Sequence, residues 1–238
     1  YKKANLNESL IRLTLGQFEI GWKKYEARFN KNDLIMRYTN EKIWKGDYLD
    51  GTLLVWGEQG LGDHILFASM LTDLKKYAKN IILQIDMRLE KLLKRYFKKI
   101  NFSNIKIVNS EKKLIDGFNK HIAIGSLGQY LRNSKKSFET TPQQFLIPSS
   151  SKVNEFKQKF FKGDKFKIGV SWKTLNKKQQ FRNISLKQML PILSNTNCDF
   201  INLQFGKFDK DLEKFKAKYG LNIRSINEID NFNNIDDL

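Results

Sequence analysis

Residues 53–63 read Leu-Leu-Val-Trp-Gly-Glu-Gln-Gly-Leu-Gly-Asp, and this stretch decides the fold class. The apolar run predicts a buried strand, the glycines predict a turn, and an amphipathic helix pattern begins at Asp63. Glycines let a backbone pass close to a ligand and into a helix N-terminus. Strand, turn and helix together predict a nucleotide-type crevice in an α/β fold.

Two familiar phosphate-binding loops almost match this turn, and both fail. The Walker loop requires Lys and then Ser or Thr after its last glycine, where this chain has Asp63 and His64. The dinucleotide fingerprint requires G-x-G-x-x-G, whereas the spacing here is G-x-x-G-x-G, which disfavours an oxidoreductase. Because a carboxylate at a helix entrance repels phosphate, we expect this loop to position an acid. The alternative is that Asp63 only caps the helix.

The composition limits the class of protein. With 238 residues, 40% of them hydrophobic, the chain can bury the core of one large or two small domains. No apolar run approaches the roughly 18 residues of a membrane-spanning helix, and no signal peptide is recognisable, so a cytoplasmic location is expected. Cys198 is the only cysteine, and His64 and His121 are the only histidines. We therefore expect no disulfide within the chain and no metal site.

The net charge of +18 raises the question of nucleic-acid binding. Most of the 43 basic residues are lysine, and they are spread over every segment, with many Asn, Ile and Phe besides. That skew is typical of proteins encoded by AT-rich genomes. We expect no specific nucleic-acid partner, although attraction to anionic ligands such as nucleotide diphosphates or acidic glycans is compatible with the charge.

Three segments follow from the pattern along the chain. Residues 1–45 repeat apolar side chains at helical spacing on both sides of Gly16 and predict a helical hairpin. Residues 46–148 alternate strand and helix patterns, which predicts a parallel sheet with helices on its faces. The strands are expected at 53–56, 81–85, 105–108 and 121–124, and the helices at 63–77 and 88–97. Ser126 lies in a second small-residue turn, 125–128, at the same sheet edge as the first.

A boundary is marked by two prolines and by the serines at 149–151. In residues 149–238 we expect strands at 167–172, 200–204 and 223–225, and helices at 153–161, 185–193 and 212–219. Three short strands do not comfortably close a Rossmann-type sheet. The second domain is therefore expected to be incomplete.

These residues together resemble a known family. Residues 54–63 resemble the signature of bacterial tetratricopeptide-repeat glycosyltransferases of the GT-B fold, which are related to heptosyltransferases and more distantly to O-GlcNAc transferases. Residues 15–26 resemble the last repeat helix of that family, and residues 43–46 resemble its linker. Residues 169–172 with 182–186 are similar to the opening of its C-terminal domain, and residues 203–206 resemble the second strand edge there. The resemblance runs over nearly the whole chain, in order.

The resemblance implies two Rossmann-like domains, an acceptor-side one at 46–148 and a partial donor-side one at 149–238, after a repeat-like hairpin at 1–45. It implies a metal-independent, inverting transfer of sugar from a nucleotide sugar to a hydroxyl, with no further cofactor. Asp63 matches the carboxylate proposed as general base. An inverting transfer needs such a base opposite the leaving diphosphate. The loop and acceptor-side candidates are Gly60, Gly62, His64 and Ser126, and the donor-binding candidates are Lys173, Arg182 and Gln204.

One departure from the family matters. Its strongest donor-binding motif and its full repeat array have no counterpart in this sequence, so we expect a fragment of a longer protein that is inactive alone. The alternative reading is a non-catalytic scaffold that binds a protein or glycan. Which sugar, nucleotide and acceptor are used is left open by the sequence.

Overall fold

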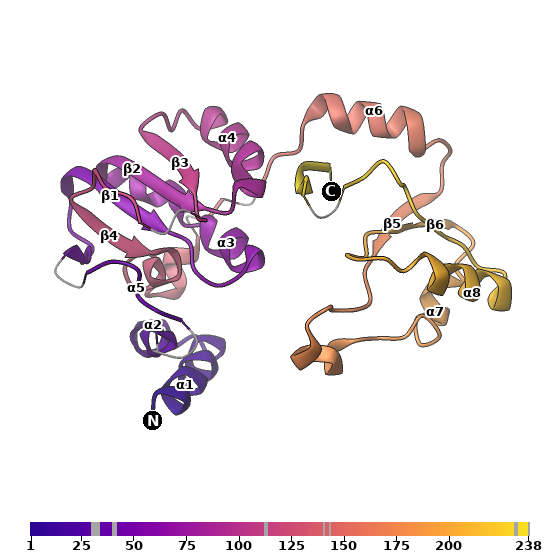
Figure 1. The fold of residues 1–238 in the computed structure, drawn as a ribbon, viewed down its shortest axis with the longest axis horizontal. Coiled ribbons are helices and arrows are strands. Elements are labelled where there is room, and N and C mark those ends of the chain that lie inside the picture. The colour runs from indigo at the N-terminus through magenta and orange to yellow at the C-terminus, as the bar shows by residue number, and fades with distance from the viewer. Residues whose placement is uncertain are drawn as a thin grey trace. The chain divides into compact units, whose positions relative to one another are not determined.

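The computed structural model describes residues 1–29, 34–39, 42–111, 114–139, 141–142, 144–230 and 233–237, and it describes Lys177 and Lys178 by their backbone only. The chain divides into two compact units, residues 1–147 and residues 148–238. Each unit contains its own parallel β-sheet (Figure 1).

A helical hairpin opens the first unit. Helix α1 covers Lys2–Thr14, α2 covers Phe18–Tyr25, and a 3-10 turn, η1, covers Glu26–Arg28. The chain reverses at Gly16, whose φ of 76° is open to glycine without strain. The two helices pack closely at Gly21, where a Cβ atom would lie only 2.8 Å from the Leu13 side chain. Residues 2–28 thus form a helical hairpin, and its identity as the end of a repeat array stays a prediction.

The sheet of the first unit is parallel throughout, in the order β3-β2-β1-β4. Strand β1 covers Leu49–Trp56, β2 covers Ala78–Ile85, β3 covers Ile105–Asn109 and β4 covers Lys120–Ala123. From β1 the chain adds strands first on one side and then, with β4, on the other. Such a topological switch point is where open α/β sheets bind ligands, at the carboxyl ends of the strands.

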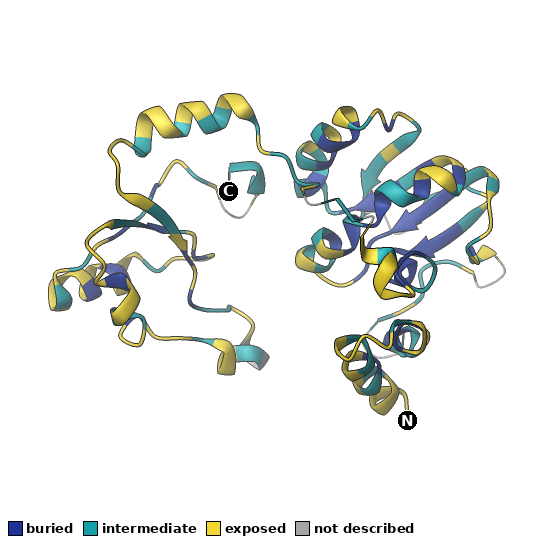
Figure 2. Cartoon of the chain, turned by 180° about the vertical axis from the view of Figure 1, so that it is seen from behind, coloured by how far each residue is buried: buried dark blue, intermediate teal, exposed yellow. Residues whose placement is uncertain are grey.

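The carboxyl-terminal parts of β1, β2 and β4 are buried, whereas β3 at the edge of the sheet is only partly buried (Figure 2). On one face, Leu54 and Trp56 pack with Ala123 and with partly buried residues such as Phe29 and Tyr38. The intervening β1 side chains, Leu53 and Val55, point to the opposite face and are equally buried. Continuous burial of this kind is typical of parallel strands.

The predicted single helix over 63–77 is wrong. Helix α3 covers Leu61–Ala68, and residues Leu71–Lys76 form a separate 3-10 helix, η3. The α-helix tightens at its end, where Ser69 Oγ donates to the Leu66 carbonyl and the Met70 N–H donates to the Phe67 carbonyl, three residues back. The helix predicted over 88–97 is observed as a 3-10 turn, Met87–Leu89, and α4, Glu90–Lys99.

The second unit has a three-stranded parallel sheet in the order β5-β6-β7. Strand β5 covers Phe166–Val170, β6 covers Cys198–Asn202 and β7 covers Ile223–Arg224. Helix α6 (Ser150–Phe160) precedes the sheet, and α7 (Leu190–Leu193) and α8 (Asp209–Tyr219) follow β5 and β6. The core contains Val170, Trp172, Leu186, Leu193, Phe200, Leu212, Phe215 and Ile223.

The helix predicted over 185–193 is α-helical only in α7. Pro191 stands in the first turn of α7. Proline lacks the N–H that would bond to the carbonyl four residues back, and its ring clashes with that carbonyl, so a helix can begin at this point but not run through it. The strand predicted to extend to residue 204 ends at Asn202.

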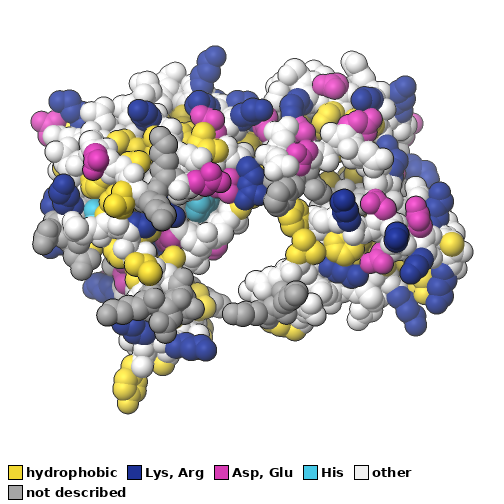
Figure 3. Space-filling view, viewed as in Figure 1, with side chains coloured by type: hydrophobic (Ala, Val, Ile, Leu, Met, Phe, Trp, Pro, Cys, Tyr) yellow, Lys and Arg dark blue, Asp and Glu magenta, His cyan; other side chains and the backbone are white. Residues whose placement is uncertain are grey.

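The described surface has a mixed charge pattern. On the face shown in Figure 3, Lys and Arg side chains are scattered among Asp and Glu rather than gathered over one element. Among the described residues, no helix is both long and apolar enough to cross a membrane. The same residues contain no group of three or more His, Cys, Asp or Glu side chains that could hold a metal ion.

Candidate functional site

The glycine turn lies at the carboxyl end of β1, beside the switch point. Gly57 is buried, and its N–H donates to the Gln84 carbonyl, which extends the pairing of β1 with β2. Gln59 has a φ of 65°, in the left-handed region that favours glycine. Gly60 is the N-cap of α3, and Gly62 lies exposed in its first turn with no atom near its Cβ position.

Asp63 occupies the third position of α3 and is partly exposed. Its Oδ2 accepts a hydrogen bond from the Gly60 N–H at 3.0 Å, and this is the one hydrogen bond its carboxylate makes within the described part of the chain. A carboxylate in a first helical turn also meets the positive end of the helix dipole. The capping alternative is therefore realised in part, although Gly60 and not Asp63 is the N-cap. The general-base role stays a prediction.

His64 is buried behind the turn. Its Nδ1 accepts from the Asp86 N–H at 3.3 Å, which places the ring proton on Nε2 when the ring is neutral. The ring lies against Gly57, where a Cβ would meet Nε2 at 2.3 Å. Burial lowers the pKa of His64, and the carboxylates of Asp86 and Asp63 oppose this. His64 therefore supports the turn as a neutral packing residue.

A buried ion pair joins the turn to the helical hairpin. The Arg28 guanidinium donates to Glu58 Oε1 from Nε at 3.1 Å and from Nη2 at 2.8 Å, and both side chains are almost fully buried. The same oxygen accepts from the Gly125 N–H at 3.2 Å. Burial raises the pKa of Glu58, which Arg28 opposes. The guanidinium also lies over the rings of Tyr25 and Phe29, at 4.5 and 4.2 Å from their centroids.

Ser126 connects the second small-residue turn to this cluster. Its Oγ accepts from Arg28 Nη2 at 2.7 Å and donates to Glu26 Oε1 at 2.7 Å. Arg28 Nη1 donates to the same Glu26 oxygen. The hairpin and the two turns that follow β1 and β4 therefore meet in one buried network, so Ser126 has a structural role in addition to the acceptor-side role predicted for it.

Gln204 organises the edge of the second sheet. Its Oε1 accepts from the N–H groups of Trp172 and Lys173, both at 2.8 Å, and its Nε2 donates to the carbonyls of Lys173 and Phe205. The side chain is 1% exposed. Gln204 was predicted to contact a donor. In the structure its amide shapes the strand-end turn that carries Lys173.

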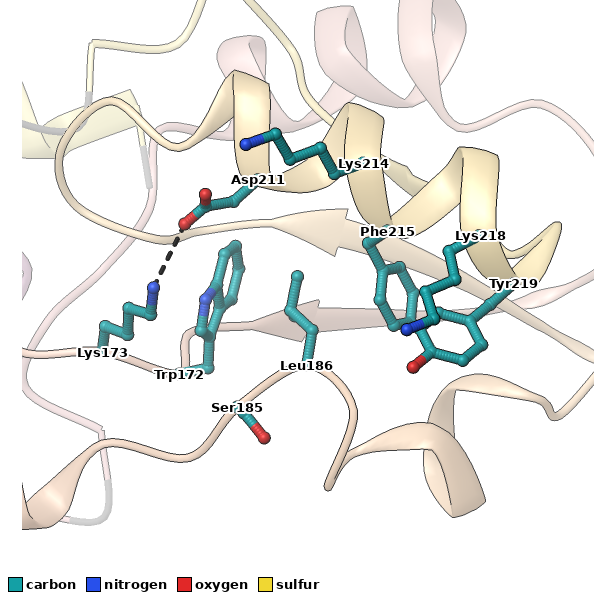
Figure 4. Close-up of a pocket in the computed structure, with 9 residues that line it drawn as sticks. All are labelled: Trp172, Lys173, Ser185, Leu186, Asp211, Lys214, Phe215, Lys218 and Tyr219. Atoms are coloured by element: carbon teal, nitrogen blue, oxygen red, sulfur yellow. Dashed lines mark hydrogen bonds and ion pairs between the residues drawn. The ribbon is translucent and has the colours of Figure 1, made fainter.

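Lys173 lines a cavity of about 310 Å³ (Figure 4). Trp172 and Phe215 contribute aromatic surface, and Lys173 Nζ forms an ion pair with Asp211 Oδ2 at 3.1 Å. The remaining lining residues are Ser185, Leu186, Lys214, Lys218 and Tyr219. An anion bound by Lys173 would have to compete with Asp211.

Arg182 is exposed at the end of the 3-10 helix Lys177–Arg182 and donates to Gln179 Oε1. The loop after β5 reaches this region, because Asn183 Oδ1 accepts from the Thr174 N–H at 2.7 Å and the Ile184 N–H donates to the Trp172 carbonyl. In the first unit the predicted residues lie in the turns and the helix that follow β1 and β4, whereas in the second unit Lys173 and Gln204 lie just after β5 and β6 and Arg182 lies in the exposed loop beside them. The acceptor-side candidates lie in residues 1–147 and the donor-binding candidates in residues 148–238.

Tyr25, Arg28 and Glu58 were missed by the sequence reasoning. One signal was present, because Arg28 lies three residues after Tyr25 and beside Phe29, within the apolar helical stripe. A charged side chain such as that of Arg28 within an apolar stripe lies either at the edge of the stripe or in an ion pair. The sequence spacing could not reveal that its partner is Glu58, 30 residues away.

Protein FlbA of Caulobacter vibrioides is 28% identical to this chain over 247 residues, an alignment that covers 96% of the chain and 41% of FlbA. The chain thus spans about two fifths of the length of this relative. No protein-family model matches the chain, and no solved structure matches it.

Proposed function

We propose that this chain carries part of the active site of a glycosyltransferase that moves a sugar from a nucleotide sugar to a hydroxyl acceptor. The observation that carries the proposal is Asp63, a partly exposed carboxylate on the helix after the β1 glycine turn, beside the switch point of the order β3-β2-β1-β4. Open α/β sheets bind their ligands at this place. The resemblance of residues 54–63 to the glycosyltransferase signature supports the same activity.

The proposed reaction is a single displacement. The acceptor oxygen forms a bond to the anomeric carbon while the bond from that carbon to the diphosphate breaks, and Asp63 takes the hydroxyl proton. Inversion follows because base and leaving group stand on opposite faces of the sugar. Lys173 and Arg182 are the candidates that would offset the charge of the departing nucleoside diphosphate. The GT-B arrangement, the metal independence and a cytoplasmic location belong to this proposal.

The test uses the full product of the gene, a panel of labelled nucleotide sugars, and the variant Asp63→Asn. An Asn oxygen can still accept from the Gly60 N–H, so the cap of α3 is kept while the base is lost. We expect turnover to fall by about 100-fold or more, since general-base catalysis contributes roughly 10²–10⁴. Asp50→Asn is the matched control, because Asp50 is an exposed carboxylate at the amino end of the same strand. Undiminished turnover by folded Asp63→Asn would refute the mechanism.

A non-catalytic scaffold for a protein or glycan is the second candidate. The buried Arg28–Glu58 pair, which ties the hairpin to the sheet, supports it. So do the exposed apolar side chains Leu10, Ile11, Leu15 and Ile20 on the hairpin. For this function, no nucleotide sugar in the panel would be turned over or would raise the melting temperature. A rise in melting temperature with one nucleotide sugar of the panel would favour the glycosyltransferase.

A further inference from the structure

Two consecutive residues of the glycine turn are held by the helical hairpin. Glu58 is bound by Arg28, and the Gln59 Nε2 donates to the Tyr25 hydroxyl at 3.0 Å. Tyr25 and Arg28 are three residues apart, where side chains share one face of a helix. Tyr25 is 8% exposed and packs edge-on against Trp22 at 5.7 Å between centroids, so its hydroxyl is a fixed acceptor.

The Gln59 contact is notable because its backbone is strained. A non-glycine residue at a φ of 65° costs roughly 1–2 kcal/mol relative to the right-handed region. Glycine would adopt this backbone conformation without strain, and it already occupies positions 57, 60 and 62 of the same turn. What glycine could not supply is the amide that reaches Tyr25. The side chain therefore ties the turn to the hairpin in a conformation that the backbone does not favour.

This tether lies next to the candidate base. Gly60, which follows Gln59, caps α3 and donates to Asp63 Oδ2 at 3.0 Å. A rotation of the turn at Gln59 would move the Gly60 N–H and with it the carboxylate. Since Gln59 and Gly60 are both exposed, core packing does not hold this half of the turn in place.

We propose that Tyr25 and Gln59 are positioning residues for Asp63, so that the helical hairpin sets the place of the carboxylate through the Tyr25–Gln59 hydrogen bond. The inference rests on the proposed transferase function and adds that the hairpin belongs to the active-site machinery. Neither residue is catalytic, because both act through the turn.

The experiment is a double-mutant cycle in the full gene product. Tyr25→Phe and Gln59→Met remove the same hydrogen bond from opposite sides with little change of shape. Each is expected to lower kcat about tenfold at unchanged KM for the nucleotide sugar, because misplacement by about 1 Å can cost up to about 100-fold. The double variant is expected to lose no more than either single one. The inference would be overturned if the double variant lost kcat by the product of the two single losses. It would also be overturned if the two single variants had the same kcat as the parent.

Two further measurements separate positioning from stability. Gln59→Gly relieves the strained backbone and removes the tether, so we expect a melting temperature no lower than the parent's, together with the same loss of kcat. Tyr96→Phe is the matched control: the Tyr96 hydroxyl is paired with Thr72 at 2.9 Å within the same unit, and its loss should leave kcat unchanged. A loss of kcat that tracked the melting temperature across these variants would mean a purely structural role.

Hydrogen exchange gives a readout that does not depend on activity. Amides 58–63 should exchange faster in Tyr25→Phe and Gln59→Met than in Tyr96→Phe, and equal exchange would overturn the tether by itself. Failure of the two ideas is distinguishable. Absence of any sugar transfer by the parent protein would refute the function and this inference with it. Asp63-dependent transfer that both tether variants leave intact would refute the inference alone.

Discussion

Gly57 is required by the approach of a side chain rather than by its backbone angle. A Cβ at this position would meet Nε2 and Cε1 of buried His64 at 2.3 and 2.5 Å. The ring is held through its Nδ1 by the Asp86 N–H and cannot simply swing away. Overpacking of this kind costs about 1–3 kcal/mol.

We therefore expect Gly57→Ala to lower the free energy of unfolding by about 1–3 kcal/mol, as measured by urea denaturation. Gly62→Ala is the matched control. Its Cβ meets no atom within 4 Å, and it lies inside α3, where alanine is favoured over glycine by up to ~1 kcal/mol. Equal effects at the two positions would show that the His64 ring does not lie where the structure has it.

The two histidines predict how stability depends on pH. Burial lowers the pKa of His64 and of His121, so both are neutral when folded and take up a proton more readily when unfolded. His121 is fixed in this form by Trp56 Nε1, which donates to its Nδ1, and by the Thr39 carbonyl at its Nε2. The stability that comes from keeping both rings neutral is fully present above pH 6.5, the pKa of histidine in the unfolded chain. It is lost as the pH falls below that pKa.

Between pH 7 and about 5.5 the free energy of unfolding should fall, by at most about 1.4 kcal/mol per pH unit for each histidine. His64→Asn keeps an acceptor at the Nδ1 position, His121→Gln keeps a donor to the Thr39 carbonyl at the Nε2 position, and together they remove both titrations. This variant should be less stable at pH 7 but show a flatter dependence in denaturation at several pH values. A slope as steep as the parent's would assign the effect to other groups.

At the scale of an element, the turn after β5 depends on one side chain. Gln204 satisfies the N–H groups of Trp172 and Lys173, which would otherwise be left without a partner at the sheet edge. A buried polar group without a partner costs about 1–3 kcal/mol. Gln204→Leu should lower the stability of the second unit by at least that much and expose amides 172 and 173 to hydrogen exchange. Gln158→Leu, on the exposed face of α6, should change stability by less than about 0.5 kcal/mol.

The helices, strands and turns of both units show what could be predicted from the sequence and what could not. The positions of strands β1 to β4 follow from short apolar runs, most clearly at residues 53–56 of β1, whose side chains are buried on both faces of the sheet. The place of Asp63 at a sheet edge follows from the glycines after such a run. The roles of Gln204 and Glu58 do not follow, since each depends on partners about 30 residues away along the chain. The single helix predicted over 63–77 is wrong because the chain changes to 3-10 hydrogen bonding after Ala68, a change that the continuous local pattern does not reveal.

At the scale of the whole molecule, the two units have separate cores. The cluster around Val170 and Phe200 draws only on residues of 148–238, and the cluster around Leu54 and Trp56 only on residues of 1–147. A shared cooperative transition requires shared buried contacts. We therefore expect unfolding in two steps, followed segment by segment through hydrogen exchange in increasing urea. Gly57→Ala should move only the transition of residues 1–147, and Gln204→Leu only that of residues 148–238. If either substitution moved both transitions equally, the two units would have to unfold as one, and the helical hairpin and both sheets would form a single cooperative core.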